Sequence, residues 1–400
     1  MTRRPTIAVM FAMLGPYHVA RLKAAADVGN VLAIEGSATS DVYAWEKTAD
    51  AGGMRRITLF ADAPIACKKR AEIASRVVAV LAAIRPDVVL VPDWASAWGF
   101  AMLAWAASNR VPAIIMSESQ AIDLVRSPVR ECVKRRVVGA FSAGFAGGRR
   151  HADYLAQLGM ARERIFTGYD VVDNRHFGEG ARRARNDAAA LRRRLGLPAR
   201  YFLASARFVA EKNLGRLIEA YAAYRAAARE GAWGLVILGD GPLRPELERR
   251  AAARGLTDAV TMPGFKQYDA LPAYYGLAEA FVHVSTCEPW GLVVNEAAAA
   301  GLPLIVSDRC GCRPELIEDG RNGLAIDPLD APAIAAAMTA IAAADRDRAA
   351  MGRASEAIVG RWSPETFAAG MAKAVDLALA KPREAPGRFD RLLVTALRRI

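Results

Sequence analysis

The sequence has few of the residues that build metal centres or disulfide frameworks. Its 400 residues include only five cysteines and four histidines. An odd number of scattered cysteines indicates reduced thiols, as in the cytoplasm. The pair in Cys310-Gly311-Cys312 is too tight for the usual zinc spacing, and the histidines add no ligand set, so we expect no metal site. The cysteines are Cys67, Cys132, Cys287, Cys310 and Cys312.

Long hydrophobic runs are also lacking. No run of eighteen apolar residues occurs, so no segment is predicted to span a membrane. Arg3 and Arg4 precede an apolar stretch that extends to Leu14, in the manner of a signal peptide. Because Gly15-Pro16 interrupts this stretch and no small-residue cleavage site follows, we interpret it as the first strand of the fold.

Acidic residues are outnumbered: 54 lysines and arginines face 42 aspartates and glutamates, which leaves a formal charge of +12. This excess favours an anionic partner, such as nucleic acid, an acidic membrane face or a phosphorylated substrate. The sequence has no zinc-finger spacing, aromatic RNA-binding signature or basic-zipper heptads, so we expect no nucleic-acid partner. Arginine- and alanine-rich composition is also typical of high-GC genomes, so charge alone decides little.

What the sequence does contain is a regular alternation of short β-rich runs with longer helical patterns. Its length predicts two domains, and 53% hydrophobic residues suffice for two cores. Continuous apolar strands alternating with helices predict parallel sheets covered on both faces. We therefore expect an α/β protein with two Rossmann-like, doubly wound domains that bind ligands in a cleft between the carboxyl ends of their strands. The predicted strands are Ile7–Met10, Val31–Ile34, Ile57–Phe60, Val88–Val91, Ala113–Met116, Phe141–Ala146, Tyr201–Ala204, Gly234–Leu238, Val260–Met262, Ala280–Val284, Leu304–Ser307 and Leu324–Ile326.

The alternation stops in one arginine-rich stretch, which ends at Gly196-Leu197-Pro198. We interpret this stretch as a linker between the two domains. Ser363-Pro364 is a typical helix start further along the chain. The predicted organisation is an N-terminal domain over 1–170, a linker over 171–200, a second domain over 201–362, a helix over 363–380 and a basic tail over 381–400.

The tail has apolar residues at helical spacing and a net charge of +4. Two interpretations remain open for it. One is a closing helix packed on a neighbouring domain, and the other is an anchor on an anionic membrane surface.

The most informative segment is Cys287–Ala297, which contains two carboxylates eight residues apart. Glu288 is predicted on the loop after a strand, and Glu296 one turn into the next helix. Gly291 lets backbone approach a ligand, and the free amides of a helix start form an anion site. A donor with a sugar, a diphosphate and a ribose in a row suits this order of groups. The alternative is that both glutamates only cap or decorate the helix.

Two cations follow the first strand of the second domain. Arg207 leaves the strand end, and Lys212 lies where the next helix begins. At these positions both point toward the predicted cleft, where they would neutralise a diphosphate and stabilise its growing charge as the sugar departs. As an isolated pair they would instead be ordinary surface residues.

These motifs together resemble glycosyltransferase family 4 of the GT-B fold, continuously from Tyr201 to about Asp327. The resemblance implies transfer of a sugar with retention, no cofactor or metal requirement, and a UDP- or GDP-linked sugar donor. The acceptor would be a glycan, a lipid-linked sugar or a small molecule in polysaccharide or glycolipid biosynthesis. The enzyme would work in the cytoplasm, at the inner membrane face where its acceptor is lipid-linked. The motifs are Gly239-Asp240-Gly241-Pro242, Pro263-Gly264-Phe265, Glu288-Pro289-Trp290-Gly291-Leu292-Val293-Val294-Asn295-Glu296-Ala297, Ala300-Gly301-Leu302-Pro303 and Asp319-Gly320-Arg321-Asn322-Gly323.

The resemblance also implies roles for single residues. Glu288 would meet the transferred sugar and Glu296 the ribose, while Arg207 and Lys212 would meet the diphosphate. The helix after Trp362 would cross back to the first domain. The remaining donor-binding candidates are Gly15, Phe265, Lys266, Trp290, Gly291 and Leu292.

The N-terminal half resembles the family more loosely, as expected of an acceptor domain. His18 follows the first strand at a helix start, where it would bind phosphate, orient the acceptor hydroxyl or only cap the helix. Many family members carry a histidine after the fifth strand. Here that place has Glu118, which would contact the sugar or the acceptor hydroxyl instead.

Other functions stay open at this stage. A nucleotide-sugar epimerase or a sugar phosphorylase could use the same fold, and a non-catalytic partner subunit could retain it. A dehydrogenase is disfavoured because no predicted strand is followed by the full glycine fingerprint for dinucleotides.

Overall fold

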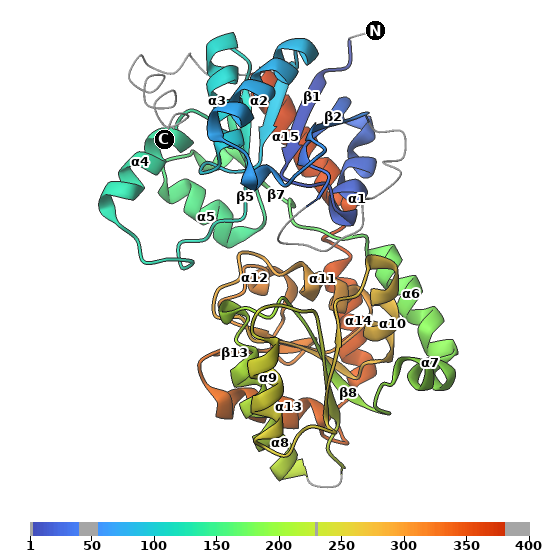
Figure 1. Cartoon of the computed structure of the whole chain (residues 1–400). Helices are drawn as coiled ribbons and strands as arrows, with labels where there is room; N and C mark the ends of the chain where they lie inside the picture. The colour runs from blue at the N-terminus through green and yellow to red at the C-terminus, as the bar shows by residue number, and fades with distance from the viewer. Residues whose placement is uncertain (1–2, 40–54, 229–230, 381–400) are drawn as a thin grey trace. The chain divides into compact units, whose positions relative to one another are not determined.

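The computed structural model describes residues 3–39, 55–228 and 231–380, so the predicted tail at 381–400 lies outside the described residues. The chain forms two compact units (Figure 1). The first comprises Met1–Val171 and the chain from Ser363 onward, and the second comprises Val172–Trp362. Each unit is described below by itself.

The first unit is built on a seven-stranded parallel sheet with the order β3-β2-β1-β4-β5-β6-β7. The central strands read as unbroken apolar runs and are fully buried, since helices cover both faces of a doubly wound sheet. The strands are β1 (Thr6–Phe11), β2 (Asn30–Ser37), β3 (Arg55–Phe60), β4 (Val88–Val91), β5 (Ala113–Ser117), β6 (Ala143–Ala146) and β7 (Ile165–Thr167). The helices are α1 (Pro16–Ala24), α2 (Arg70–Ile84), α3 (Ala97–Asn109), α4 (Pro128–Val138), α5 (Arg149–Gln157) and α15 (Pro364–Ala380).

The second unit repeats the plan with a six-stranded parallel sheet, in the order β10-β9-β8-β11-β12-β13. Its strands are β8 (Tyr201–Ser205), β9 (Gly234–Leu238), β10 (Val260–Gly264), β11 (Ala280–His283), β12 (Leu304–Ser307) and β13 (Gly323–Ile326). Its helices are α6 (Asn174–Asn186), α7 (Ala188–Leu195), α8 (Leu214–Ala228), α9 (Arg244–Ala252), α10 (Leu271–Leu277), α11 (Leu292–Ala299), α12 (Arg313–Leu316), α13 (Ala331–Ala342) and α14 (Arg348–Val359).

Each predicted strand corresponds to an observed one, and the apolar stretch after Arg4 is β1. The two doubly wound sheets are the predicted fold class. One strand was not predicted: β7 has only three residues and is half-buried to exposed, so it lacks a continuous apolar run.

The predicted linker at 171–200 is largely helical, which corrects that prediction. Helices α6 and α7 belong to the second unit, and α6 packs closely on α10 and α11. The many arginines concealed an amphipathic helix, because Phe177, Ala181 and Ala184 form its buried face. Several of those arginines hold carbonyl groups at helix ends, as Arg185 does with the carbonyl oxygen of Ala300.

Helix α15 lies in the first unit although it follows the second unit in sequence. It packs on α1, β6 and β7, and Phe367 contacts the ring of Phe145 with centroids 5.1 Å apart. Among the described residues, no helix has the length and apolar character needed to cross a membrane.

The contact between α6 and α10 generates a stability prediction. A Cβ added at Gly276 would lie 2.6 Å from the carbonyl oxygen and 2.7 Å from the Cα of Ala181. We expect Gly276→Ala to destabilise the second unit by about 1–3 kcal/mol, because two backbones must separate. Differential scanning calorimetry measures this change as a lower Tm. Gly231→Ala is the control, since no atom lies within 4 Å of an added Cβ there. Equal Tm values for the two variants would contradict the prediction.

Candidate active site

Glu288 lies on the loop between β11 and α11, at the carboxyl edge of the second sheet. The loop is held in place by a parallel β-bridge between Glu288 and Cys310, which follows the neighbouring strand β12. The amide of Gly311 donates to the carbonyl oxygen of Glu288 at 3.0 Å. The backbone at Glu288 is therefore fixed before any ligand arrives.

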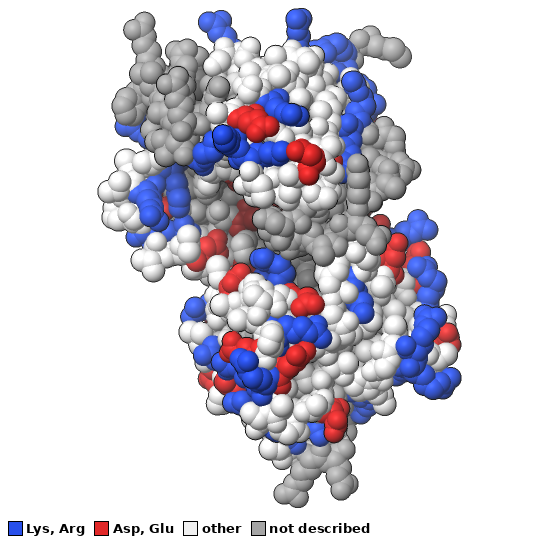
Figure 2. All heavy atoms as spheres, in the orientation of Figure 1, with Lys and Arg blue, Asp and Glu red and all other residues white. Residues whose placement is uncertain are grey.

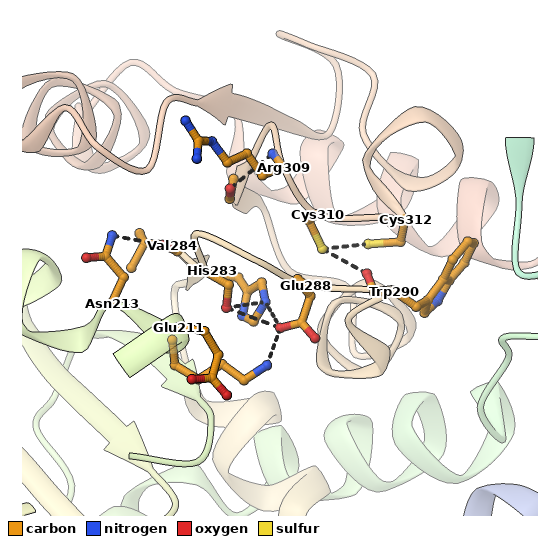
Figure 3. Close-up of polar contacts among 12 residues, drawn as sticks. Glu211, Asn213, His283, Val284, Glu288, Trp290, Arg309, Cys310 and Cys312 are labelled. Carbon is orange, nitrogen blue, oxygen red and sulfur yellow. Dashed lines mark hydrogen bonds and ion pairs between the residues drawn. The ribbon is translucent and has the colours of Figure 1, made fainter. Parts of the chain in front are cut away.

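The Glu288 carboxylate is almost completely buried and is surrounded by hydrogen-bond donors (Figure 3). Its Oε2 atom lies 2.6 Å from Lys212 Nζ, 2.8 Å from His283 Nε2 and 3.1 Å from Ser285 Oγ. A buried carboxylate needs such partners because leaving water is costly for an ion. The structure thus brings Lys212 and Glu288, both predicted site residues, into direct contact.

The charges in this cluster support one another. Burial by itself raises the pKa of Glu288, but His283 and Lys212 outweigh it and lower that pKa to about 2. Burial by itself lowers the pKa of His283, but hydrogen bonds with Cys310 and Glu288 raise it to about 9. At neutral pH a carboxylate therefore lies between an imidazolium and an ammonium group.

Gly291 begins helix α11 with a φ of +98°, in the left-handed region that favours glycine. An added Cβ would lie 2.8 Å from Cys310 Sγ and 3.2 Å from Glu288 Cγ. The Cys310 thiol donates to the carbonyl oxygen of Trp290 at 2.8 Å and lies 3.4 Å from Cys312 Sγ (Figure 3). Only glycine lets the chain turn here into α11 while this sulfur pair packs beneath it.

Glu296 lies in the second turn of α11 and is 1% exposed. Tyr275 on α10 donates its hydroxyl to Glu296 Oε2 at 2.6 Å. This bond aims the carboxylate, because a buried tyrosine hydroxyl has few alternative partners. The neighbouring residue of Tyr275 on α10, Gly276, packs tightly against the backbone of α6 and so holds Tyr275 in place.

The indole of Trp290 is buried against other side chains, and the role of this residue toward a donor stays a prediction. Its Nε1 donates to Asn295 Oδ1 at 2.8 Å, and its ring lies 5.3 Å from that of Trp362. Its carbonyl oxygen accepts from Cys310 and Cys312. Trp290 thus supports the loop from below, while Leu292 at the start of α11 is half-buried.

The other candidates of the second unit also follow strand ends. Arg207, after β8, is exposed, and its guanidinium lies 3.8 Å from Glu211 Oε1. Phe265 and Lys266 follow β10 and are half-buried, with Lys266 Nζ 5.9 Å from the ring centre of Tyr274. Their roles toward a donor stay predictions.

In the first unit, His18 acts as part of the helix start. The Gly15 amide donates to His18 Nδ1 at 3.1 Å, and the imidazole lies 4.2 Å from the ring of Phe11. Burial, with a smaller effect from Arg21, lowers the pKa of His18 to about 3. The ring is therefore neutral in the unliganded protein, and its role toward phosphate or the acceptor hydroxyl stays a prediction.

Glu118 is exposed at the end of β5, and it lies near a buried carboxyl that the sequence did not reveal. Asp170 is fully buried, and Arg21 contacts it at 3.4 Å. Burial and Glu118 together raise the pKa of Asp170 well above its usual range, against the opposing charge of Arg21. Asp170 and Glu118 thus form an interacting pair of carboxyl groups, and the role of Glu118 toward the sugar or the acceptor hydroxyl stays a prediction.

Sequence reasoning missed His283, Ser285, Cys310, Tyr275 and Asp170. His283 had one signal, because it is a polar residue in the apolar strand β11. Ser285 lies three residues before Glu288 on the same loop, whereas Cys310 and Tyr275 come from other elements of the second unit. Asp170 belongs to the first unit.

Residues 189–357 match the family model described as glycosyl transferases group 1. This part of the chain is similar to that family. The match confirms the resemblance seen in the motifs, and its range lies within the second unit.

Two curated relatives show the extent of the similarity. Alpha-D-kanosaminyltransferase of Streptomyces kanamyceticus is 39% identical over 151 residues, which cover 38% of each chain. A GDP-mannose-dependent alpha-(1-6)-phosphatidylinositol monomannoside mannosyltransferase of Mycobacterium tuberculosis (strain CDC 1551 / Oshkosh) is 31% identical over 256 residues. The second match covers 61% of this chain and 64% of the relative. The chain thus spans between about four and six tenths of these relatives.

Solved structures resemble nearly the whole chain. Anabaena HepE in complex with UDP and glucose has a TM-score of 0.73 at 17% identity, covering 93% of this chain and 99% of HepE. Sucrose-phosphate synthase from Thermosynechococcus elongatus has a TM-score of 0.72 at 21% identity, covering 94% and 100%. At such low identity the likeness shows the fold alone. Together with the two parallel-sheet units, it confirms the GT-B fold class.

The charged cluster generates a prediction about pH. The folded-state pKa of His283 is raised above 6.5, so its charge stabilises the fold fully below pH 6.5 and ceases to do so as pH rises through about 9. We expect wild-type stability to fall over this range by at most about 3 kcal/mol more than that of His283→Gln. Thermal unfolding at a series of pH values measures the difference.

The matched control is His176→Gln on α6, which removes a histidine outside the cluster and should keep the wild-type slope. Parallel pH profiles for wild type and His283→Gln would show that His283 is not charged in the folded protein.

Proposed function

We propose that this protein is a retaining, metal-independent glycosyltransferase that uses a nucleotide-diphosphate sugar as donor. The observation that carries the proposal is the buried pair that Lys212 forms with Glu288 on the loop before α11, the helix that carries Glu296, in the region similar to the glycosyl transferases group 1 family. A surface ion pair would be weak evidence, but this one is buried and lies at the ligand-binding edge of its sheet.

The charges of the cluster suit the donor. Three cationic side chains, Arg207, Lys212 and His283, lie in or next to this cluster, where they contact the carboxylates of Glu288 and Glu211. A diphosphate approaching α11 would draw the ammonium of Lys212 toward itself. The carboxylate of Glu288 would stay charged on His283 and Ser285, ready to accept hydroxyl groups of the sugar.

The proposed reaction needs little acid–base chemistry from the protein. The acceptor hydroxyl attacks the anomeric carbon on the face that the leaving group occupies, and the departing phosphate oxygen takes the proton. Lys212 and Arg207 stabilise the charge that grows on the diphosphate as the glycosidic bond breaks. Positioning of donor and acceptor supplies much of the remaining acceleration. Because fixed cations already serve the diphosphate, the proposal includes no metal ion.

The names of related proteins support the classes of donor and acceptor. One relative is described as GDP-mannose-dependent, and a structural neighbour was solved with UDP-glucose. Two relatives are named for glycolipids: one is a phosphatidylinositol monomannoside mannosyltransferase, and the other is an alpha-monoglucosyldiacylglycerol synthase. We accordingly propose a UDP- or GDP-sugar donor and a glycan or lipid-linked acceptor. The protein would meet that acceptor at the cytoplasmic face of a membrane.

Removing either partner of the buried pair should abolish most of the activity. We expect Lys212→Met and Glu288→Gln each to lower kcat by about 10²–10³-fold, because a charge that stabilises the transition state is lost. Sugar transfer from the donor identified by binding is the measurement, with circular dichroism to verify the fold. Lys373→Met on α15 is the control, since Lys373 is exposed and belongs to the other unit. Wild-type turnover in Lys212→Met or Glu288→Gln would refute the assignment.

Donor binding can be tested before any acceptor is known. We expect calorimetry against UDP-, GDP-, ADP- and TDP-sugars, in the presence of EDTA, to find one tight donor. Glu296→Gln should weaken its binding at least about 10-fold, because a charged acceptor of the ribose hydroxyls is lost. The exposed Glu248→Gln on α9 should bind as wild type does. Absence of binding by every donor would favour a non-catalytic subunit, and donor turnover without acceptor would indicate an epimerase.

A further inference from the structure

The apolar side chains that the first unit exposes most strongly are gathered on one segment. Five of the seven large apolar residues exposed in the described part of the chain lie between positions 122 and 133. A contiguous patch of this kind marks an interaction surface, whereas single exposed apolar residues are ordinary. The five are Ile122 (59% exposed), Leu124 (70%), Val125 (101%), Val129 (75%) and Val133 (37%).

This segment has its polar groups turned inward. Arg126 donates to the carbonyl oxygens of Gln120 and Ala121, and its guanidinium lies 4.4 Å from the ring centre of Tyr154. Asp123 accepts from the Gln120 amide at 2.7 Å. In a surface loop the polar side chains normally face water. Here the polar side chains hold the loop together from within and the apolar ones face outward, so the loop suits contact with an apolar surface.

Helix α4 continues the same surface and adds positive charge. Val129, Val133 and Arg136 follow at helical spacing on one exposed face, with the exposed Arg130 and Arg135 near it. The acidic residue of the helix, Glu131, faces inward, where Lys134 and Tyr154 bind it. Figure 2 shows lysine and arginine atoms among uncharged ones around this helix. The exposed face is therefore apolar and cationic, the combination that suits the surface of an anionic bilayer.

The place of the segment in the fold bears on what it is for. It follows β5 directly and so begins at the carboxyl edge of the first sheet, as do Glu118 and the loop that leads to His18 (Figure 1). Open α/β sheets bind their ligands at this edge. A bilayer bound by the segment would thus lie beside the edge where the acceptor is expected.

We propose that residues 120–136, here called the docking segment, bind the surface of an anionic lipid bilayer. Leu124 and Val125 enter the boundary between headgroups and acyl chains, while Arg130, Arg135 and Arg136 contact lipid phosphates. The inference rests on the proposed function only in giving this docking a purpose, the delivery of a lipid-linked acceptor. Residues 381–400 do not suit the same surface as an occupant, because their net charge of +4 has the same sign.

Vesicle co-sedimentation of the full chain tests the proposal. Vesicles with 30% phosphatidylglycerol in phosphatidylcholine should bind the protein at 0.1 M salt, and pure phosphatidylcholine should bind it far less. Replacing Arg130, Arg135 and Arg136 by Gln should weaken binding on the order of 100-fold, since each surface cation contributes about fivefold. Leu124→Ser with Val125→Ser should weaken it at least about 10-fold.

Matched variants in the second unit serve as controls. Arg193→Gln, Arg194→Gln and Arg249→Gln together remove the same charge from exposed positions, and Leu329→Ser removes an exposed apolar residue. Both should bind vesicles better than the docking-segment variants do. If all variants bind equally well, or if the wild type ignores anionic vesicles, the proposal is wrong.

A local probe separates the docking segment from every other part of the chain. Cys132 is exposed on α4 between Val129 and Val133, and Cys67 is exposed elsewhere in the first unit. An environment-sensitive dye on Cys132 in a Cys67→Ser protein should brighten and shift to the blue on anionic vesicles. The same dye on Cys67 in a Cys132→Ser protein should not. Response from Cys67 alone would refute docking through α4.

Donor binding without lipid, measured on the same variants, keeps this inference distinct from the proposed function. Docking-segment variants should bind the nucleotide sugar as the wild type does. If the protein binds vesicles but no donor, the docking proposal stands and the proposed transferase function is wrong. If it binds a donor but no vesicles, the proposed function stands and the docking proposal is wrong.

Discussion

The structure of the site depends on one buried negative charge. The carboxylate of Glu288 has left water almost completely, and an unpaired ion in that position would cost several kcal/mol. This cost is offset by Lys212, His283 and Ser285, which all contact the Oε2 atom of Glu288. His283 and Ser285 come from the end of β11 and the loop after it, and Lys212 comes from the segment after β8, so two neighbouring strand ends must be in place for the charge to be tolerated.

A parallel sheet is the device that makes this convergence possible. Because all strands run the same way, the residues after β8, β11 and β12 emerge side by side. The loop after β8 nevertheless precedes the loop after β12 by about a hundred residues in sequence. The bridge between Glu288 and Cys310 then ties two of these loops together. Gly291 completes the arrangement by letting α11 begin directly above the sulfur of Cys310.

Much of the fold was predictable because its signals are local. Twelve of the strands were predictable as apolar runs in the sequence. Strand β7 was not, because it is short and partly exposed. The arginine-rich stretch before Pro198 misled, since a charged composition concealed the buried stripe of Phe177, Ala181 and Ala184. In the site, Glu288 and Lys212 stood out through their motifs. The partners that charge or aim them, His283 and Tyr275, did not.

The sequence by itself determined the class of fold, the order of the strands along the chain and the glutamate and lysine positions of the site. These follow from periodicity and from short motifs, which neighbouring residues carry. Only the tertiary structure decided that Lys212 binds Glu288, that His18 accepts from the Gly15 amide at the helix start and that the indole of Trp290 is buried. It also showed that Arg126 turns inward while Leu124 and Val125 face water. Burial and charge pairing depend on residues distant in sequence, and no local pattern encodes them.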